Sequence, residues 1–185
     1  MNIVFFDVET QRTFDEVGGR NNIQALGLAA AVTYATAGGT FGYYVETDVE
    51  ALLAELRSAD LVVGFNLYGF DYQVLRAYGP FDMPNTVDLL DHIHRRLGFR
   101  VSLDNLAGAT LGAAKSADGL QAVRWYREAG QQTDEAQRQA LMQKIFDYCQ
   151  QDVEITRRLF EYGRQFKHVK FRDRNFRVQT VPVSW

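Results

Sequence analysis

The chain has 185 residues, 46% of them hydrophobic, which is enough for one well-packed domain and short for two. Its single cysteine, Cys149, excludes an internal disulfide, argues against a cysteine-based zinc cluster and favours a reducing compartment. The net charge of -3 argues mildly against non-specific binding of duplex nucleic acid, which depends on Lys and Arg neutralising phosphates.

The N-terminus begins directly with a strand pattern, and no apolar run approaches the roughly 18 residues of a membrane span. We therefore expect a soluble, cytoplasmic protein that does not bind membranes. No dimerisation seam is visible, so a monomer is the default expectation.

The first third of the chain predicts three strands, a helix and a further strand. The strand segments are rich in apolar, aromatic and β-branched residues, whereas the helix has apolar residues at helical spacing. In chain order we expect a buried strand at 3–8, a polar loop at 11–22, an apolar segment at 23–34, its hairpin partner at 40–45, a helix at 48–58 and a strand at 61–63. A helix that feeds a buried strand suggests a parallel crossover, so the sheet should be mixed.

The rest of the chain predicts mainly helices. We expect a helix at 69–78, an extended segment at 85–88, a helix to about 97, short helices between 102 and 129, a long helix at 133–164 with Thr133 as its N-cap, and a tail at 167–185 that alternates basic and apolar residues. Together these elements predict a single α/β domain over 1–185, with a mixed sheet of about five strands flanked by helices and a basic C-terminal segment.

Two carboxylates lie one residue apart in the first strand, in the segment FFDVET. Alternate side chains of a strand point to the same face, so Asp7 and Glu9 should project together, while Phe6 and Val8 face the other side. Two adjacent carboxylates repel each other unless a cation or solvent lies between them. For this pair alone, a solvated strand end explains the acids as well as a metal site does.

The segment GFNLYGFDYQVL places polar groups where the strand at 61–63 runs into a helix. Asp71 in the first helical turn is explained by the helix dipole, and Asn66 by a capping role. Neither explanation accounts for an acid close to the end of a strand that should lie near the first strand.

On the long helix, Tyr148 and Asp152 are four residues apart and therefore share one face. Ile145 and Cys149 mark the buried side nearby. Taken alone, the pair is explained by a structural hydrogen bond.

In chain order, the three segments resemble the three motifs of the DEDD family of 3′-5′ exonucleases, which includes polymerase proofreading domains and RNase D-like nucleases. The resemblance covers most of the chain and rests on Asp7 and Glu9, on Asn66 with Phe70 and Asp71, and on Tyr148 with Asp152. In the family's histidine subgroup the histidine stands five residues before the last Asp, where this chain has Asp147. The chain is therefore similar to the tyrosine (DEDDy) subgroup. The implied fold is ribonuclease H-like, although periodicity alone also allows other α/β sheets.

The resemblance implies a two-metal site for Mg²⁺ or Mn²⁺, ions that prefer hard oxygen ligands. By this resemblance Asp7 bridges both ions, Glu9 and Asp152 bind one of them, and Asp71 holds the other partly through water. Tyr148 would orient the attacking water.

Three further residues are expected to bind the substrate by the same resemblance, namely Thr10, Asn66 and Phe70. An ordinary strand-end threonine explains Thr10 equally well. Lys115 is expected to be solvated, with a phosphate contact as the alternative.

A zinc reading of the acids and histidines near residue 90 is weak, since His92 and His94 are two apart on a predicted helix and should diverge. Asp88 is expected to start this helix, with an outer-shell role at the metal site as the alternative.

The tail interleaves basic residues with Phe171 and Phe176, as phosphate contacts and base stacking require. Charges that protect an edge strand from aggregation explain the same pattern, and both readings stay open.

We therefore expect a metal-dependent 3′-5′ exonuclease that acts on single-stranded DNA or RNA and releases nucleoside 5′-monophosphates. The alternative is a non-catalytic binding module of a helicase or polymerase assembly, although such a module has no need for four acids. A phosphodiesterase acting on small nucleotides is a third alternative.

Overall fold

A computed structural model describes residues 1–80, 82, 84–113 and 119–185. Lys115 lies outside the described residues, so the expectation for its side chain stays a prediction.

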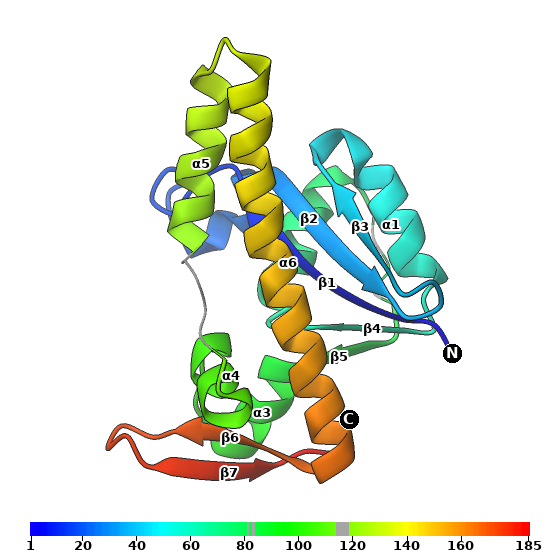
Figure 1. Ribbon diagram of the computed structural model, residues 1–185, viewed down its shortest axis with the longest axis vertical. Helices are drawn as coiled ribbons and strands as arrows, with labels where there is room; N and C mark the ends of the chain where they lie inside the picture. The colour runs from blue at the N-terminus through cyan, green and yellow to red at the C-terminus, as the bar shows by residue number, and fades with distance from the viewer. Residues whose placement is uncertain (81, 83, 114–118) are drawn as a thin grey trace.

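The centre of the molecule is a mixed sheet of five strands in the order β3-β2-β1-β4-β5 (Figure 1). The strands are β1 (Ile3–Thr10), β2 (Leu28–Ala35), β3 (Thr40–Tyr44), β4 (Leu61–Gly64) and β5 (Thr86–Asp88). β1 pairs antiparallel with β2 and parallel with β4, and β4 pairs parallel with β5. This arrangement confirms the predicted five-stranded mixed sheet.

Helices follow the strands and make up most of the remaining described residues. They are α1 (Val49–Ser58), α2 (Asp71–Leu75), α3 (Leu89–Leu97), α4 (Leu103–Leu111), α5 (Gly119–Gln131) and α6 (Glu135–Phe166), with 3-10 helices η1 (Arg20–Leu26), η2 (Glu46–Asp48) and η3 (Arg76–Tyr78). Among the described residues, no helix combines the length and apolarity needed to span a bilayer.

The alternation of side chains along β1 feeds two hydrophobic cores. Ile3 and Phe5 pack into the core on the side of α6, whereas Val4, Phe6 and Val8 pack into the core on the side of α1 and α2. In Figure 1 the long α6 crosses one face of the sheet, and α1 lies behind the other. The sheet is therefore fixed from both sides beneath the acids of β1.

Several predicted boundaries are wrong. Only the part of the apolar segment 23–34 from Leu28 onward forms a strand, because Gly27 takes a positive φ of 70° and separates η1 from β2. The N-cap of α6 is Asp134, not Thr133: the Asp134 side chain accepts a hydrogen bond of 3.0 Å from the Ala136 N–H. A carboxylate is also the better partner for the positive end of a helix.

The predicted helix at 69–78 is shorter and divided. α2 begins at Asp71, and the chain continues as the 3-10 helix η3 from Arg76. The short α2 places Asp71 at its first position, directly beside the main sheet.

The C-terminal segment forms a separate hairpin of β6 (His168–Arg172) and β7 (Val178–Pro182). Side chains of α4 attach it to the domain. The amide and carbonyl groups of Asn105 bond the backbone of Arg172 at 2.9 and 2.7 Å, and the Thr110 hydroxyl bonds both backbone groups of Lys170 at 2.9 and 2.8 Å. The hairpin is therefore held rigidly against α4.

Candidate functional site

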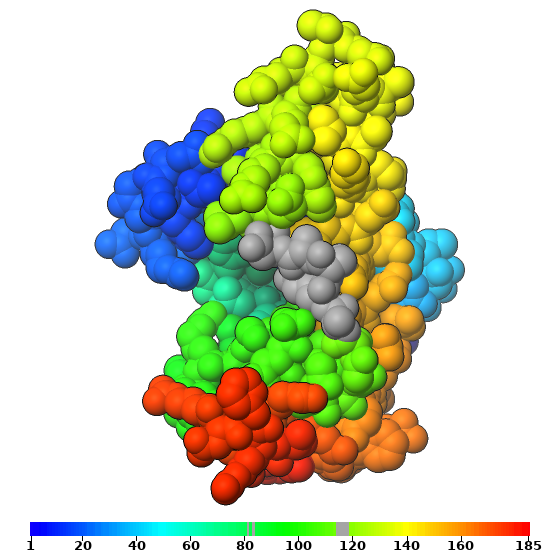
Figure 2. All heavy atoms as spheres, turned by 60° about the vertical axis from the view of Figure 1, so that its left-hand side comes forward, coloured from blue at the N-terminus to red at the C-terminus, as the bar shows by residue number. Residues whose placement is uncertain are grey.

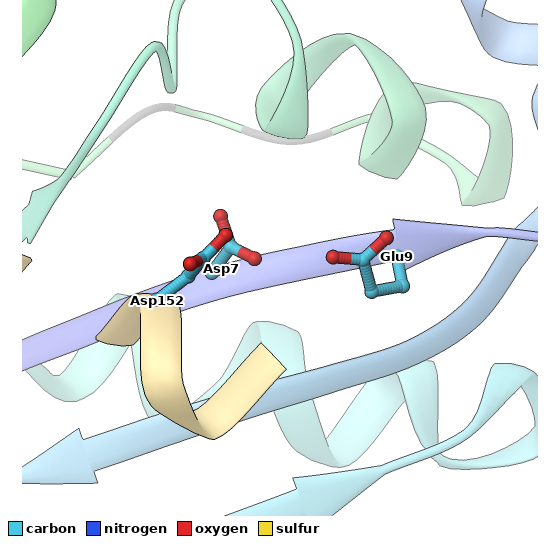
Figure 3. A group of neighbouring side chains, drawn as sticks. All are labelled: Asp7, Glu9 and Asp152. Carbon is cyan, nitrogen blue, oxygen red and sulfur yellow. The ribbon is translucent and has the colours of Figure 1, made fainter. Parts of the chain in front are cut away.

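Asp7 and Glu9 project from the same face of β1 near its C-terminal end, as the strand period predicts (Figure 3). Their strand is longer than predicted and continues to Thr10. The pairing with β2 shifts register between Glu9 and Thr10, which is a bulge-type irregularity. Such bulges re-aim side chains and often lie next to functional sites.

Asp152 reaches the two β1 acids from α6, which crosses the sheet above them. Oxygen atoms of Asp7, Glu9 and Asp152 all lie within 4.8 Å of one another. Glu9 and Asp152 are only 7% and 5% exposed, so the charges sit in a largely buried position. We call these three residues the acidic triad.

Asp71 lies beside the acidic triad but outside this tight group. Its side chain is 1% exposed, and its Oδ1 accepts a hydrogen bond of 3.0 Å from the Val8 N–H. Burial raises the pKa of Asp71 to about 8; the nearby negative charges of Asp88 and Asp152 act in the same direction, against two backbone hydrogen bonds. Ionised Asp71 therefore requires compensation by positive charge.

The acids lie in a pocket of about 500 Å³, which we call the acidic pocket. The predicted site residues that line it are Asp7, Glu9, Thr10, Phe70, Asp71, Tyr148 and Asp152. Tyr148 is buried one helical turn before Asp152, whereas the neighbouring Asp147 is exposed and accepts a hydrogen bond of 2.8 Å from the Gln143 amide on the helix surface. The structure thus brings together segments that are far apart in the sequence.

An aromatic wall closes one side of the acidic pocket. Phe70 contacts Phe14 edge to face, with ring centroids 6.0 Å apart, and Arg20 lies over the Phe14 ring at 4.8 Å. The Thr10 hydroxyl donates a hydrogen bond of 3.0 Å to the Arg12 carbonyl and so stabilises the turn out of β1. The side chains of Arg12 and Arg20 also line the pocket.

Helix α5 forms the opposite wall of the acidic pocket. Its residues Gly119, Leu120 and Val123 line the pocket, and an ion pair between Arg127 and Glu16 ties α5 to the loop after β1. Figure 2 shows the blue loop and the yellow-green α5 side by side, with a recess of the surface below the blue loop.

Asn66 does not line the acidic pocket. It adopts a left-handed conformation with φ 70°, its N–H donates to Asp88 Oδ1 at 2.8 Å, and its Oδ1 accepts from Arg100 at 2.7 Å. It lines a smaller neighbouring pocket together with Asp88 and His94. Asn66 therefore stands beside the site predicted for it, and contact with substrate there stays a prediction.

Asp88 is the N-cap of α3 and accepts hydrogen bonds from the N–H groups of Leu90 and Asp91. It also accepts from the N–H groups of Asn66 and Tyr68, so one buried carboxylate fixes both the loop after β4 and the start of α3. The prediction that it starts a helix is confirmed.

The two histidines on α3 diverge, as predicted. His92 contacts the Trp185 ring at 5.0 Å, whereas His94 is exposed and lines the smaller pocket. Among the described residues, the acidic triad is the group whose His, Cys, Asp and Glu side chains are close enough to hold a metal ion together.

Cys149 makes a contact that the sequence analysis missed. Its buried thiol donates to the Asp7 carbonyl at 3.2 Å and to Asp7 Oδ2 at 3.5 Å. The predicted burial of Cys149 is confirmed, and its position three residues before Asp152 was the available signal for proximity to the acids. The arginines and the α5 wall gave no comparable signal, because their segments carry no motif.

The acidic triad fits a divalent cation by its donor chemistry. Three carboxylates held this close repel one another, and hard carboxylate oxygens are the donors that Mg²⁺ and Mn²⁺ prefer. Asp71 lines the same pocket, and its predicted role as a metal ligand stays a prediction.

A family model for the RNase_H superfamily matches residues 4–163, from β1 through most of α6. No curated protein matches the chain. The matched span includes every residue that lines the acidic pocket, and members of this superfamily are generally nucleases that use divalent metals. On the strength of this match, of the five-stranded mixed sheet and of the acids above it, the chain belongs to the RNase_H superfamily.

Proposed function

We propose that the protein is a 3′-5′ exonuclease that hydrolyses the terminal phosphodiester bond of single-stranded DNA or RNA and releases nucleoside 5′-monophosphates. The observation that carries this proposal is the acidic triad, whose oxygens lie within 4.8 Å of one another in a pocket also lined by Asp71 and Tyr148. This set of side chains, drawn from β1, α2 and α6, is the one that the DEDD resemblance requires.

Two divalent ions bound by these acids would stabilise the negative charge on the attacking and leaving oxygens. Asp7, which Figure 3 shows between the side chains of Asp152 and Glu9, is the residue proposed to contact both ions. Asp71 is proposed to hold the second ion partly through water, in keeping with its place outside the tight group. Cys149 holds the Asp7 carboxylate in position by its hydrogen bond.

The environment of α6 supports the tyrosine subgroup. Tyr148 is buried and lines the acidic pocket, whereas Asp147, which occupies the position of the histidine in the other subgroup, points to solvent. We propose that the Tyr148 hydroxyl orients the attacking water by a hydrogen bond.

The shape of the acidic pocket supports action at a strand end. A volume of about 500 Å³ suits a small ligand such as one nucleotide, and the apolar side chains of Phe14, Phe70 and Leu120 line the pocket. These apolar walls suit an unstacked base, and Arg12 and Arg20 suit its phosphates. A duplex would have to open before its end entered.

The proposal is tested with single-stranded DNA and RNA labelled at the 5′ end, in Mg²⁺, Mn²⁺ or EDTA. We expect a ladder that shortens from the 3′ end only with metal. Asp7→Asn should abolish it, and Asp147→Asn, the same change on the exposed side of α6, should not.

Internal cuts would contradict the exonuclease proposal. Binding without cleavage under every metal would favour the accessory module of a helicase or polymerase. Cleavage that shows no dependence on strand length would favour a small-nucleotide phosphodiesterase.

A further inference from the structure

A second groove, of about 680 Å³, lies between the α3–α4 connection and the tip of the β6–β7 hairpin. We call it the hairpin groove. Its lining residues are Phe99, Arg100, Val101, Ser102, Asn105, Arg172, Asp173, Arg174 and Asn175. It is larger than the acidic pocket, and nothing in the proposed cleavage reaction uses it.

The lining of the hairpin groove is basic. Arg100, Arg172 and Arg174 contribute three positive charges against the single carboxylate of Asp173. Both Asp173 oxygens are occupied within the hairpin, where they accept from the N–H groups of Asn175 and Arg177 in the turn and from the Gln179 amide of β7. Neither Arg172 nor Arg174 forms a salt bridge with a carboxylate of the described residues, so both guanidinium groups are available to an anion.

Phe176 stands at the tip of this hairpin in an unfavourable setting. It is 86% exposed and has φ 60°, a left-handed conformation that favours glycine and that bulky residues rarely adopt. Its N–H donates to the Asp173 carbonyl at 3.0 Å and closes the turn, at a position of positive φ that glycine usually occupies. The Phe176 ring is exposed although its backbone conformation is energetically unfavourable, and this combination indicates a function for the ring.

The groove is rigid and faces the same side of the molecule as the acidic pocket. The contacts of Asn105 and Thr110 fasten β6 to α4. Figure 2 shows the red hairpin, the green α3–α4 region, the blue loop and α5 on one face. Arg100 lines both the hairpin groove and the smaller pocket that contains Asn66, so the basic surface leads toward the acidic pocket.

We infer that the hairpin groove binds the phosphate backbone of single-stranded nucleic acid, with Arg172 and Arg174 at the phosphates and Phe176 stacked on a base. Arginines beside an exposed aromatic ring are the combination by which proteins hold single strands without reading sequence. That the bound segment lies upstream of a 3′ end in the acidic pocket rests on the proposed function; the binding itself does not.

The first test measures binding of fluorescent single strands of about 16 nucleotides in EDTA, where no cleavage occurs. Arg172→Ala/Arg174→Ala should weaken binding about 25-fold at 0.1 M salt and reduce the slope of log K against log salt by about 1.4, since each phosphate contact on a single strand releases about 0.7 counterions. The charge-matched control, Arg57→Ala/Arg158→Ala, removes two exposed arginines outside the groove and should bind like wild type. Equal losses in both double variants would overturn the inference, because net charge alone would explain them.

The second test separates the ring from the fold. Phe176→Gly removes the aromatic group and suits the left-handed backbone, so its melting temperature should equal or exceed that of wild type. Its affinity for the same strand should fall about fivefold or more. Unchanged affinity would refute the stacking role and leave a protein partner as the explanation of the exposed ring.

A trinucleotide distinguishes this inference from the proposed function. If both hold, the two groove variants cleave the trinucleotide at the wild-type rate and lose kcat/KM only on the longer strand. If wild type cleaves nothing but the binding differences persist, the groove inference stands and the exonuclease proposal falls. If wild type cleaves and the groove variants bind the long strand normally, the exonuclease proposal stands and the groove inference falls.

Discussion

The acidic pocket and the hairpin groove place charge in opposite settings. The pocket gathers buried carboxylates from β1, α2 and α6, elements that are distant in the chain and fixed by both hydrophobic cores. The groove gathers exposed arginines from one turn and one connection, held by a few side chains of α4. A buried charge needs a specific partner of opposite charge. The effect of exposed charges depends on how many there are and on how strongly salt screens them. A single substitution in the acidic pocket should therefore abolish cleavage, whereas a single substitution in the hairpin groove should only weaken strand binding.

The largest expected effect tests the pocket side of this contrast. Asp7→Asn keeps the size of the side chain but removes the charge proposed to contact both ions, so kcat should fall about a thousandfold or more, because a bound metal supplies several kcal/mol of transition-state stabilisation. The measurement is initial rate on a labelled single strand, with circular dichroism to verify the fold. If the variant retained a tenth of the wild-type rate, a substitution in the acidic pocket would only reduce function, as expected for the hairpin groove, and the contrast would be wrong.

Tyr148→Phe should have a smaller effect in the same pocket. The ring stays packed against Ala30, Ala122 and Ile145, and only the hydroxyl is lost. We expect kcat to fall about ten- to a hundredfold, as for loss of correct orientation, with KM nearly unchanged. A loss as complete as that of Asp7→Asn would mean that Tyr148 takes part in proton transfer.

Asp71→Asn should separate stability from activity. The carboxyl has its ordinary pKa of 3.8 when unfolded and about 8 in the fold, so the folded state holds more protons between these values and wild-type stability falls as pH rises from about 4 to 8. In EDTA the variant should melt at nearly the wild-type temperature at pH 4 and several degrees above it at pH 8, while losing activity. Mg²⁺ at pH 8 should stabilise wild type more than the variant. Parallel melting curves across this pH range would contradict the burial argument.

The smallest effect concerns how the hairpin is fastened. An added Cβ at Gly163 on α6 would lie 2.5 Å from the Trp185 ring, which stacks on Phe160 and donates to its carbonyl at 3.0 Å. We expect the free energy of unfolding of Gly163→Ala, measured with urea, to be about 1–3 kcal/mol lower than that of Gly130→Ala. Gly130 is a helical glycine with open space around it and serves as the control. Activity on a trinucleotide should not change. Equal stability of the two variants would show that Trp185 moves aside freely.

Much of the fold can be predicted from local sequence patterns, because the repeat of side-chain direction is short both in a strand and in a helix. Alternation along 3–8 predicts β1 and the shared face of Asp7 and Glu9, and the four-residue spacing predicts the shared face of Tyr148 and Asp152. What brings these two faces together is the crossing of α6 over the sheet, which depends on the packing of whole elements. For that step the sequence offered only the family resemblance.

What the sequence did not predict has local physical causes. Gly27 interrupts an apolar run that looks like one strand, because hydrophobicity does not reveal a positive φ. The left-handed backbone of Asn66 and the bond from Arg100 to its Oδ1 are not predicted by a capping pattern, while its contact with substrate stays a prediction. The contact of Cys149 with Asp7 joins residues 142 positions apart, and its only signal in the sequence is the spacing of three residues between Cys149 and Asp152.

The length of α6 has a consequence for how the protein would move along a strand. The helix runs 14 residues from Asp152 to its end at Phe166, where the hairpin begins, about 21 Å at 1.5 Å per residue. With phosphates about 3.4 Å apart in a stacked strand, this length of helix corresponds to about six nucleotides. The helix ends at the base of the hairpin, and the hairpin carries the groove away from that base to its tip (Figure 1). If both proposals hold, a strand long enough to occupy the acidic pocket and the hairpin groove together would be retained between successive cuts, and its digestion would be processive. A shorter strand would be released after each cut, so the separation of the two sites would set the length of the final remnant.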